Sequence, residues 1–368
     1  MKFLGIILVV ALLAAGAFFA YRWLHVPFDE RYAQACAQFE ETGDAAAVLP
    51  VFEQAVDVYA DTPAYGDALY RLAQCETQLN DVTPERWEEV LAANTSSVAQ
   101  CEARYHLALA SADRANAIEL FVKDYPGSTY APPLLLDLGE TAMANKDVMR
   151  AWSAWEALVT HHPDAPEAQQ VRQRLGGLQM QLLCSPRPLS FTVHHEVAPG
   201  ENLTLIARKY NRPVDSLMRV NRLTSDTIRP GTRLKIDQSK YVLQVDISDH
   251  EMVLSRLTDD GMTNFVKAYP VGTGRDDNTP RGTFRIIDRL KNPTWYKPGS
   301  DPLPYGSPEN LLGTRWLGID CPGFGIHGTW EPDTVGKSSS AGCIRLLNED
   351  VEEVYDLVPV GTPVIITD

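Results

Sequence analysis

The sequence contains Ile326-His327-Gly328-Thr329 and, further on, Ser340-Ala341-Gly342-Cys343-Ile344-Arg345, and these two stretches decide how its C-terminal part folds. A thiol is mostly protonated at neutral pH, so a nucleophilic cysteine needs a neighbouring base. His327 is the candidate base for Cys343, because the intervening loop can leave one strand and return the thiol beside the imidazole. The glycines and small residues in both stretches suit a tight turn whose amides can point at a developing oxyanion.

The sequence around these stretches adds further motifs, at residues 269–274, 279–284, 292–295, 312–316, 348–350 and 358–364. With these motifs, residues 240–368 resemble the catalytic domain of the YkuD-type L,D-transpeptidases, which remodel bacterial peptidoglycan. Two positions depart from the family pattern, since Ala341 stands where histidine is common and Leu346 where methionine is common. Neither is the predicted nucleophile or base. Alternating apolar residues in this region predict a mostly-β domain.

The resemblance implies a role for individual residues. It makes Cys343 the nucleophile and His327 the base, with the Gly328 carbonyl orienting the imidazole. The backbone amides of Gly342 and Cys343 would hold the oxyanion. Substrate binding is expected from four residues: Arg345, Ser340, Thr329 and Trp316. For Arg345, the alternative role is to brace the loop. The resemblance implies no cofactor and no metal, and the six cysteines contain no CxxC pair that would suggest structural zinc.

The implied reaction is acyl transfer through a thioester on Cys343. The donor would be a peptidoglycan stem peptide that loses its terminal D-residue, and the acceptor an amine on a neighbouring stem, which forms cross-links in cell wall remodelling. Water as acceptor would instead make the protein an L,D-carboxypeptidase. An alternative from a different class is a wall-tethered adaptor that binds peptidoglycan without catalysis.

The chain begins with an apolar run, from Phe3 to Ala20, followed by Tyr21 and Trp23. A helix of this length spans about 27 Å, close to the thickness of the hydrocarbon core of a bilayer, and the aromatic residues would lie at its interface. We therefore expect residues 1–26 to form a transmembrane anchor. A cleaved signal peptide is the alternative, but its apolar core is usually shorter. The resemblance places the body outside the cytoplasm, in the periplasm or extracytoplasmic space of the bacterial cell envelope.

Residues 27–185 show helical spacing of apolar residues and a repeat. Tyr125-Pro126 recurs as His162-Pro163, and Leu138-Gly139 as Leu175-Gly176, each at an offset of 37 residues. A period of this length predicts a tetratricopeptide-like helical solenoid, because one helix pair cannot bury its apolar face alone. Such a stack could bind a protein partner, or it could be a plain helical spacer.

A compact module follows the break at Ser185-Pro186-Arg187-Pro188. Residues 191–237 show a strand, two amphipathic helices and a closing strand, and this βααβ order resembles a LysM domain, a binder of N-acetylglucosamine-containing glycans. The groove is expected between two loops, with seven glycan-binding residues: Gly200, Glu201, Asn202, Leu203, Ile228, Arg229 and Pro230. The module is locally basic, whereas the whole chain has a formal net charge of -15, which argues against a nucleic-acid partner.

Overall fold

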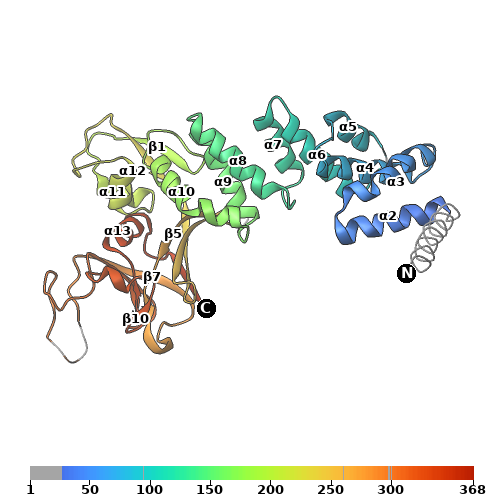
Figure 1. Cartoon of the computed structure of the whole chain (residues 1–368). Coiled ribbons are helices and arrows are strands. Elements are labelled where there is room, and N and C mark those ends of the chain that lie inside the picture. Colours follow the sequence, from blue (N-terminus) through green and yellow to red (C-terminus); the bar gives the residue numbers. More distant parts are fainter. Residues whose placement is uncertain (1–26, 94, 260, 297–298, 300) are drawn as a thin grey trace, which may run out of the picture. The chain divides into compact units, whose positions relative to one another are not determined.

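The computed structural model describes residues 27–93, 95–259, 261–296, 299 and 301–368. The described chain divides into two compact units, the first ending at Leu134 and the second running from Leu135 to Asp368 (Figure 1). The predicted fold class is confirmed for the helical region, the small βααβ module and the C-terminal β domain.

The fold class needs one correction. Within the described ranges, no helix is both long and apolar enough to cross a membrane. The anchor predicted for residues 1–26 lies outside the described residues. The described residues therefore do not support the transmembrane helix that was part of the predicted fold class.

The first unit is helical. Asp44, Ser96 and Asp113 each accept a hydrogen bond from a backbone amide in the first turn of the helix that follows, which is why these helices begin there. Neighbouring helices share small cores, such as the one built around Phe39 and Phe52. The helices are α2 (Phe28–Thr42), α3 (Ala45–Val58), α4 (Tyr65–Gln78), α5 (Pro84–Ala92), α6 (Ser97–Ala110) and α7 (Arg114–Asp124), and α8 (Ala131–Ala144) starts at its end. The tetratricopeptide-like repeat stays a prediction.

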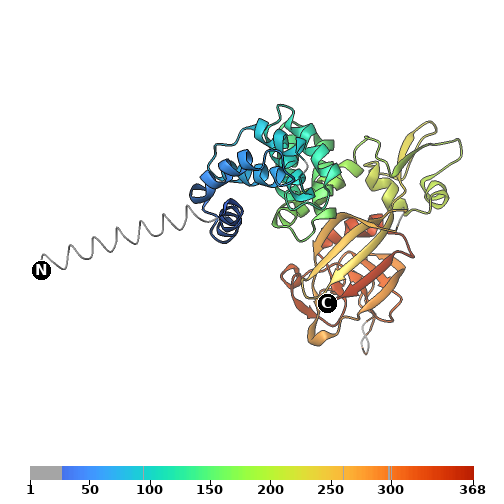
Figure 2. The same ribbon diagram turned by 90° about the vertical axis from the view of Figure 1, so that its right-hand side faces the viewer.

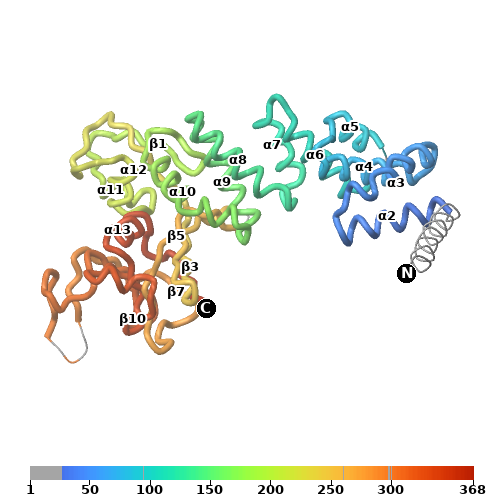
Figure 3. Tube along the Cα trace, in the orientation of Figure 1, coloured from blue at the N-terminus to red at the C-terminus, as the bar shows by residue number. Residues whose placement is uncertain are grey.

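The second unit opens with α9 (Val148–His161) and α10 (Pro166–Leu183). Helix α10 lies beside an edge strand of the C-terminal sheet, β5 (Thr263–Pro270), as the tube in Figure 3 shows. The Gln179 side chain donates to the Phe265 carbonyl at 2.7 Å, and Arg172 pairs with Glu251 at 2.6 Å. The Gln179 contact gives a backbone carbonyl of the edge strand a hydrogen-bond partner.

The βααβ module comes next in the chain. Its strands β1 (Thr192–Glu196) and β2 (Arg233–Asp237) pair antiparallel, and between them lie α11 (Leu203–Lys209) and α12 (Val214–Val220). The apolar helix positions face a core built from five fully buried side chains: Leu203, Ile206, Leu217, Leu234 and Ile236.

The C-terminal domain contains an eight-stranded sheet with the strand order β11-β9-β8-β7-β12-β3-β4-β5, and Figure 2 shows its yellow, orange and red strands together. A separate pair of short strands, β6 (Thr273–Gly274) and β10 (Ser338–Ser340), lies in the same domain. Two of the pairings are parallel, β12 with β3 and β11 with β9. The remaining strands are β3 (Lys240–Asp246), β4 (Glu251–Leu257), β7 (Gly282–Lys291), β8 (Arg315–Ile319), β9 (Gly325–His327), β11 (Ile344–Arg345) and β12 (Pro363–Thr367). Helix α13 (Asn348–Leu357) buries Val351, Val354 and Leu357 in the core of the domain.

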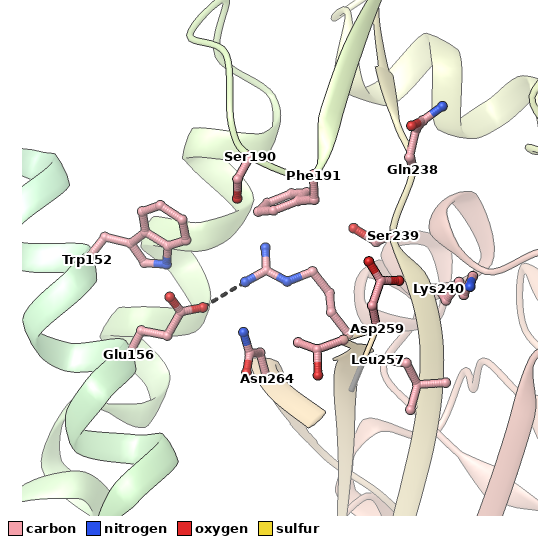
Figure 4. A pocket seen from close by; sticks show the side chains of 12 residues that line it. Trp152, Glu156, Ser190, Phe191, Gln238, Ser239, Lys240, Leu257, Asp259 and Asn264 are labelled. Atoms are coloured by element: carbon pink, nitrogen blue, oxygen red, sulfur yellow. Dashed lines mark hydrogen bonds and ion pairs between the residues drawn. The ribbon is translucent and has the colours of Figure 1, made fainter. Parts of the chain in front are cut away.

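A cavity of about 460 Å³ lies where α9 meets the sheet, and its lining includes neither His327 nor Cys343. Figure 4 shows the side chains of Trp152, Glu156 and Phe191 around it. Arg256 of β4 is only 7% exposed, pairs with Glu156 at 2.7 Å and lies 3.8 Å from the centre of the Phe191 ring. This ion pair therefore joins α9 to the sheet.

Replacing Arg256 by Met should destabilise the second unit by about 2 kcal/mol or more, because Glu156 would keep a largely buried charge without its partner. The double variant Glu156→Gln with Arg256→Met should recover part of this loss. Thermal unfolding of the two single variants and the double variant would measure the coupling. Strictly additive effects would show that the pair does not stabilise the contact.

Candidate functional site

The two predicted catalytic side chains come from adjacent strands at one edge of the sheet. Strand β9 ends on His327, and β11 begins directly after Cys343. The parallel register sets Ile344 opposite Ile326 and Arg345 opposite His327. Cys343 directly precedes Ile344, which pairs with Ile326, so the strand pairing holds the backbone of Cys343 close to β9, the strand that ends on His327.

His327 is 4% exposed, and its Nδ1 lies 2.6 Å from the Gly328 carbonyl oxygen. A carbonyl can only accept, so Nδ1 carries the proton and Nε2 keeps a free lone pair. Burial lowers the pKa of His327 to about 4; the hydrogen bond to Gly328 opposes this effect, and the nearby Arg345 charge adds to it. The Trp316 ring stacks on the imidazole, with 5.9 Å between centroids. The imidazole is therefore neutral and able to accept a proton at neutral pH.

The Cys343 thiol lies 3.7 Å from the Gly323 carbonyl oxygen. Burial raises its pKa, while a hydrogen bond from the Gly325 amide and the Arg345 charge act in the opposite direction. Among the described residues, no hydrogen bond joins this sulfur to His327. The resting pair is therefore a thiol and a neutral imidazole that are not hydrogen-bonded to each other.

The turn before the cysteine is held by Ser340. Its hydroxyl donates to the Cys343 carbonyl at 2.7 Å and accepts from the Gly342 amide at 2.9 Å. Ser340 is 1% exposed and its hydroxyl braces the turn, and the role expected for it in substrate binding stays a prediction. The Gly342 amide, predicted to bind the oxyanion, is engaged within the turn in this structure.

Gly342 cannot be replaced without moving its surroundings. Its φ of +132° lies in the region that favours glycine, and a Cβ here would lie 2.5 Å from the Phe324 ring and 2.8 Å from the Asn278 carbonyl oxygen. The turn thus needs a glycine for reasons of conformation and space.

The other predicted substrate-binding residues lie close to the pair. Arg345 contacts Glu331 at 3.3 Å and Thr334 at 3.4 Å, while its backbone pairs with Gly272, which favours the bracing alternative. The buried Thr329 accepts a hydrogen bond from the Glu331 amide at 3.0 Å. Trp316, half-buried across the ladder from His327, is placed to form a wall of the site.

Asn348 is a residue to which the sequence analysis gave no role. Its Oδ1 accepts from the Thr314 amide at 3.0 Å, and its Nδ2 donates to the Thr329 carbonyl at 2.9 Å. A Cβ at Gly328 or Gly313 would lie within 2.3 Å of Asn348 Oδ1, so both glycines make room for this side chain. Asn348 thus holds the segment that follows His327. The glycines are the signal in the sequence, but they do not identify the side chain that needs the space.

The βααβ module brings its two predicted loops together, because the Val197 amide donates to Thr232 and the Gly231 amide donates to the Val197 carbonyl. Glu201 is held by His195 at 2.8 Å, and Asn202 caps α11. Leu203 is 2% exposed and belongs to the core of the module, and its glycan contact stays a prediction. The remaining predicted residues lie on the two loops and are exposed or, for one, half-buried: Gly200, Arg229, Pro230 and Ile228.

Within the described ranges, no group of three or more His, Cys, Asp or Glu side chains could hold a metal ion.

The state of the resting pair gives a pH prediction. Iodoacetamide alkylates the thiolate, so its rate on Cys343 should follow a midpoint above the ordinary cysteine value, because burial raises this pKa. Between about pH 5 and 8 the imidazole of His327 stays neutral, so titration of His327 should add no second step to the pH profile of the rate in this range. Alkylation followed by mass spectrometry of the Cys343 peptide would measure this. Fast alkylation near pH 6 would instead indicate a thiolate–imidazolium pair.

Asn348 gives a second prediction. Asn348→Asp keeps the acceptor for Thr314 and replaces the donor to Thr329 with a repelling oxygen, so we expect acylation of Cys343 to slow by about tenfold or more. Asn348→Ala removes both contacts and should slow it at least as much. The pH profile of the rate should also change, because the imidazole loses its fixed orientation. If both variants only lower the melting temperature and keep the wild-type profile, Asn348 does not position His327.

Comparison with known proteins agrees with this geometry. The family profile described as the L,D-transpeptidase catalytic domain matches residues 240–366, and the LysM domain profile matches residues 195–237. These two domains connect the protein with peptidoglycan in the cell envelope.

Individual relatives differ in coverage. A Bacillus licheniformis protein named as the L,D-transpeptidase YkuD is 33% identical over 47% of this chain and 98% of its own length. A Bacillus subtilis protein named as the L,D-transpeptidase YqjB is 44% identical, but the match covers 27% of this chain and 58% of that relative. A solved L,D-transpeptidase from Mycobacterium smegmatis aligns with 26% identity over 38% of this chain and 64% of its own length. The TM-score of this alignment is 0.28, so it is not used to assign the family. The predicted family and enzyme class are confirmed: this chain belongs to the YkuD family of L,D-transpeptidases.

Proposed function

We propose that the protein transfers an acyl group from a peptidoglycan stem peptide to an amine acceptor through a thioester on Cys343. The observation that carries this proposal is the parallel pairing of β9 and β11, which sets a buried, neutral His327 beside the cysteine turn. A base with a free Nε2 next to a protonated thiol is the arrangement that activates a cysteine on demand.

The first half of the reaction forms the thioester. The Cys343 side chain turns from the Gly323 carbonyl toward His327, whose Nε2 takes the thiol proton. The sulfur attacks the donor carbonyl, and the negative charge moves to its oxygen. His327 returns the proton to the leaving amine of the terminal D-residue, the C–N bond breaks, and the acyl group stays on sulfur.

The second half regenerates the enzyme. The acceptor amine attacks the thioester carbonyl, His327 takes a proton from the amine, and the C–S bond breaks. The thiol recovers the proton, so no oxidant or reductant is consumed.

The oxyanion needs amide donors that are not already used. The Cys343 amide is the proposed donor, because it belongs to the attacking residue itself. The Gly342 amide would join it only after leaving Ser340, which now accepts its hydrogen bond at 2.9 Å. Each such donor contributes roughly 3 kcal/mol in other acyl-transfer enzymes.

The LysM module is proposed to hold the glycan strand while the catalytic domain works on its stem peptides. Five residues of its two joined loops, all exposed except the half-buried Glu201, form the proposed groove: Gly200, Glu201, Asn202, Arg229 and Pro230. Leu203 and Ile228 support these loops from the core side.

The test is incubation of the purified protein with a disaccharide-tetrapeptide. We expect a mass adduct on the Cys343 peptide and release of the terminal D-residue, and neither product with Cys343→Ala. His327→Gln should slow adduct formation by about 100-fold or more, because it removes the base.

The products separate the proposal from its alternatives. A new amide to a second stem supports transfer to an amine, and a disaccharide-tripeptide product would show that water is the acceptor. An unmodified wild-type protein that still pellets with sacculi would overturn the catalytic proposal in favour of an adaptor.

A further inference from the structure

A cavity of about 380 Å³ lies where the end of α10 meets the LysM module. Its walls come from the segment after α10, from the end of α12 and from the paired strands β1 and β2. Four lining side chains are histidine, arginine or lysine, and none is aspartate or glutamate: His194, Arg222, Arg233 and Lys235. In a protein of net charge -15, such a lining is unusual.

Lys235 forms the base of this cavity and is 4% exposed. Its Nζ donates to three backbone carbonyls at the end of α10, those of Leu182 and Ser185 at 3.1 Å and that of Arg187 at 2.8 Å. A lysine in this place satisfies the unpaired carbonyls of a helix C-terminus. All three of its donors are used, so Lys235 contributes fixed positive charge rather than a hydrogen bond to a ligand.

Arg222 and Arg233 carry the exposed charge of the cavity. Across residues 27–368, as far as they are described, neither guanidinium forms an ion pair. Glu196 lies opposite Arg233 in the strand register but forms no ion pair with it, and Asp237 is already bonded to Ser239 and Tyr241. The two guanidinium groups thus keep their donors available.

His194 reports the same positive field. Its register partner across the two strands is Lys235. Burial lowers the pKa of His194, and the charges of Arg233 and Lys235 lower it further. The histidine is therefore neutral at physiological pH, and its ring can donate one hydrogen bond without adding charge.

We propose that this cavity binds an oxyanion, a carboxylate or a phosphate, carried by a polymer of the cell wall. Guanidinium groups match both oxyanions in geometry, and the volume accommodates the anionic group with part of its carrier. The identity of the polymer rests on the proposed function. The site is separate from the glycan loops, so the module would hold the wall through two kinds of contact.

The first test uses the full chain carrying Cys343→Ala and titrates it with inorganic phosphate and with an N-acetylated tetrapeptide. The double variant Arg222→Gln with Arg233→Gln should weaken binding of at least one probe about tenfold at low salt. Arg208→Gln with Lys209→Gln removes two exposed charges from the same module and is the matched control, expected to change affinity less than about twofold. Equal weakening by both pairs, or none by the first, would overturn the proposal.

Cys184 supplies a local readout, because it lines the same cavity and is half-buried. Saturating phosphate or tetrapeptide should slow its alkylation by iodoacetamide and leave Cys101 of the first unit unaffected. The protection should disappear in the double arginine variant. An unchanged rate at Cys184 under saturation would show that the anion does not bind there, whatever the affinity.

Pelleting with sacculi distinguishes a phosphate ligand from a carboxylate ligand. The sacculi are either intact or stripped of phosphodiester-linked polymers by hydrofluoric acid. If the arginine variant loses binding only to intact sacculi, the ligand is a phosphate; equal loss with both assigns a carboxylate. No loss with either would count against the site. Acylation of Cys343 is measured separately, so the two proposals can fail independently.

Discussion

The pairing of two very short strands at a sheet edge is the constraint on which the site depends. Strand β11 has two residues and β9 has three, yet their register decides where the cysteine turn meets the histidine. A one-residue slip would move every side chain of β11 to the other face. Contacts outside the strands protect against this, because the Arg345 backbone is also bonded to Gly272 in both directions at 2.8 Å.

Burial then sets the chemistry of this pair in one consistent direction. The charged forms of both residues are disfavoured, so the pKa of His327 falls and that of Cys343 rises. Without substrate, Cys343 is therefore a thiol and not a reactive thiolate. In the proposed reaction, proton transfer accompanies attack on the substrate, and the oxyanion contacts stabilise the negative charge that forms.

Much of this site could be predicted from sequence because its chemistry needs particular residue types at short spacing. A cysteine after a small-residue turn and a histidine before glycine predict a nucleophile and a base, and the residue patterns predict the module and the β domain. Hydrogen-bond partners were harder to predict. Ser340 was expected to contact substrate but bonds within its turn, and Asn348 acts on a segment 19 residues earlier in the chain. Residue types limit such contacts, but the fold selects them.

Lys235 and Asn348 act in the same way, because each side chain forms hydrogen bonds with backbone groups of a segment far from it in the sequence. Lys235 joins the end of α10 to the LysM module, and Asn348 joins the start of α13 to the segment after His327. Because an unmet buried carbonyl or amide costs about 1–3 kcal/mol, each contact fixes a geometry that loose packing would leave free. These hydrogen bonds from side chains to backbone groups thus position the LysM module and the segment after His327, and they leave the neighbouring side chains available for the proposed ligands.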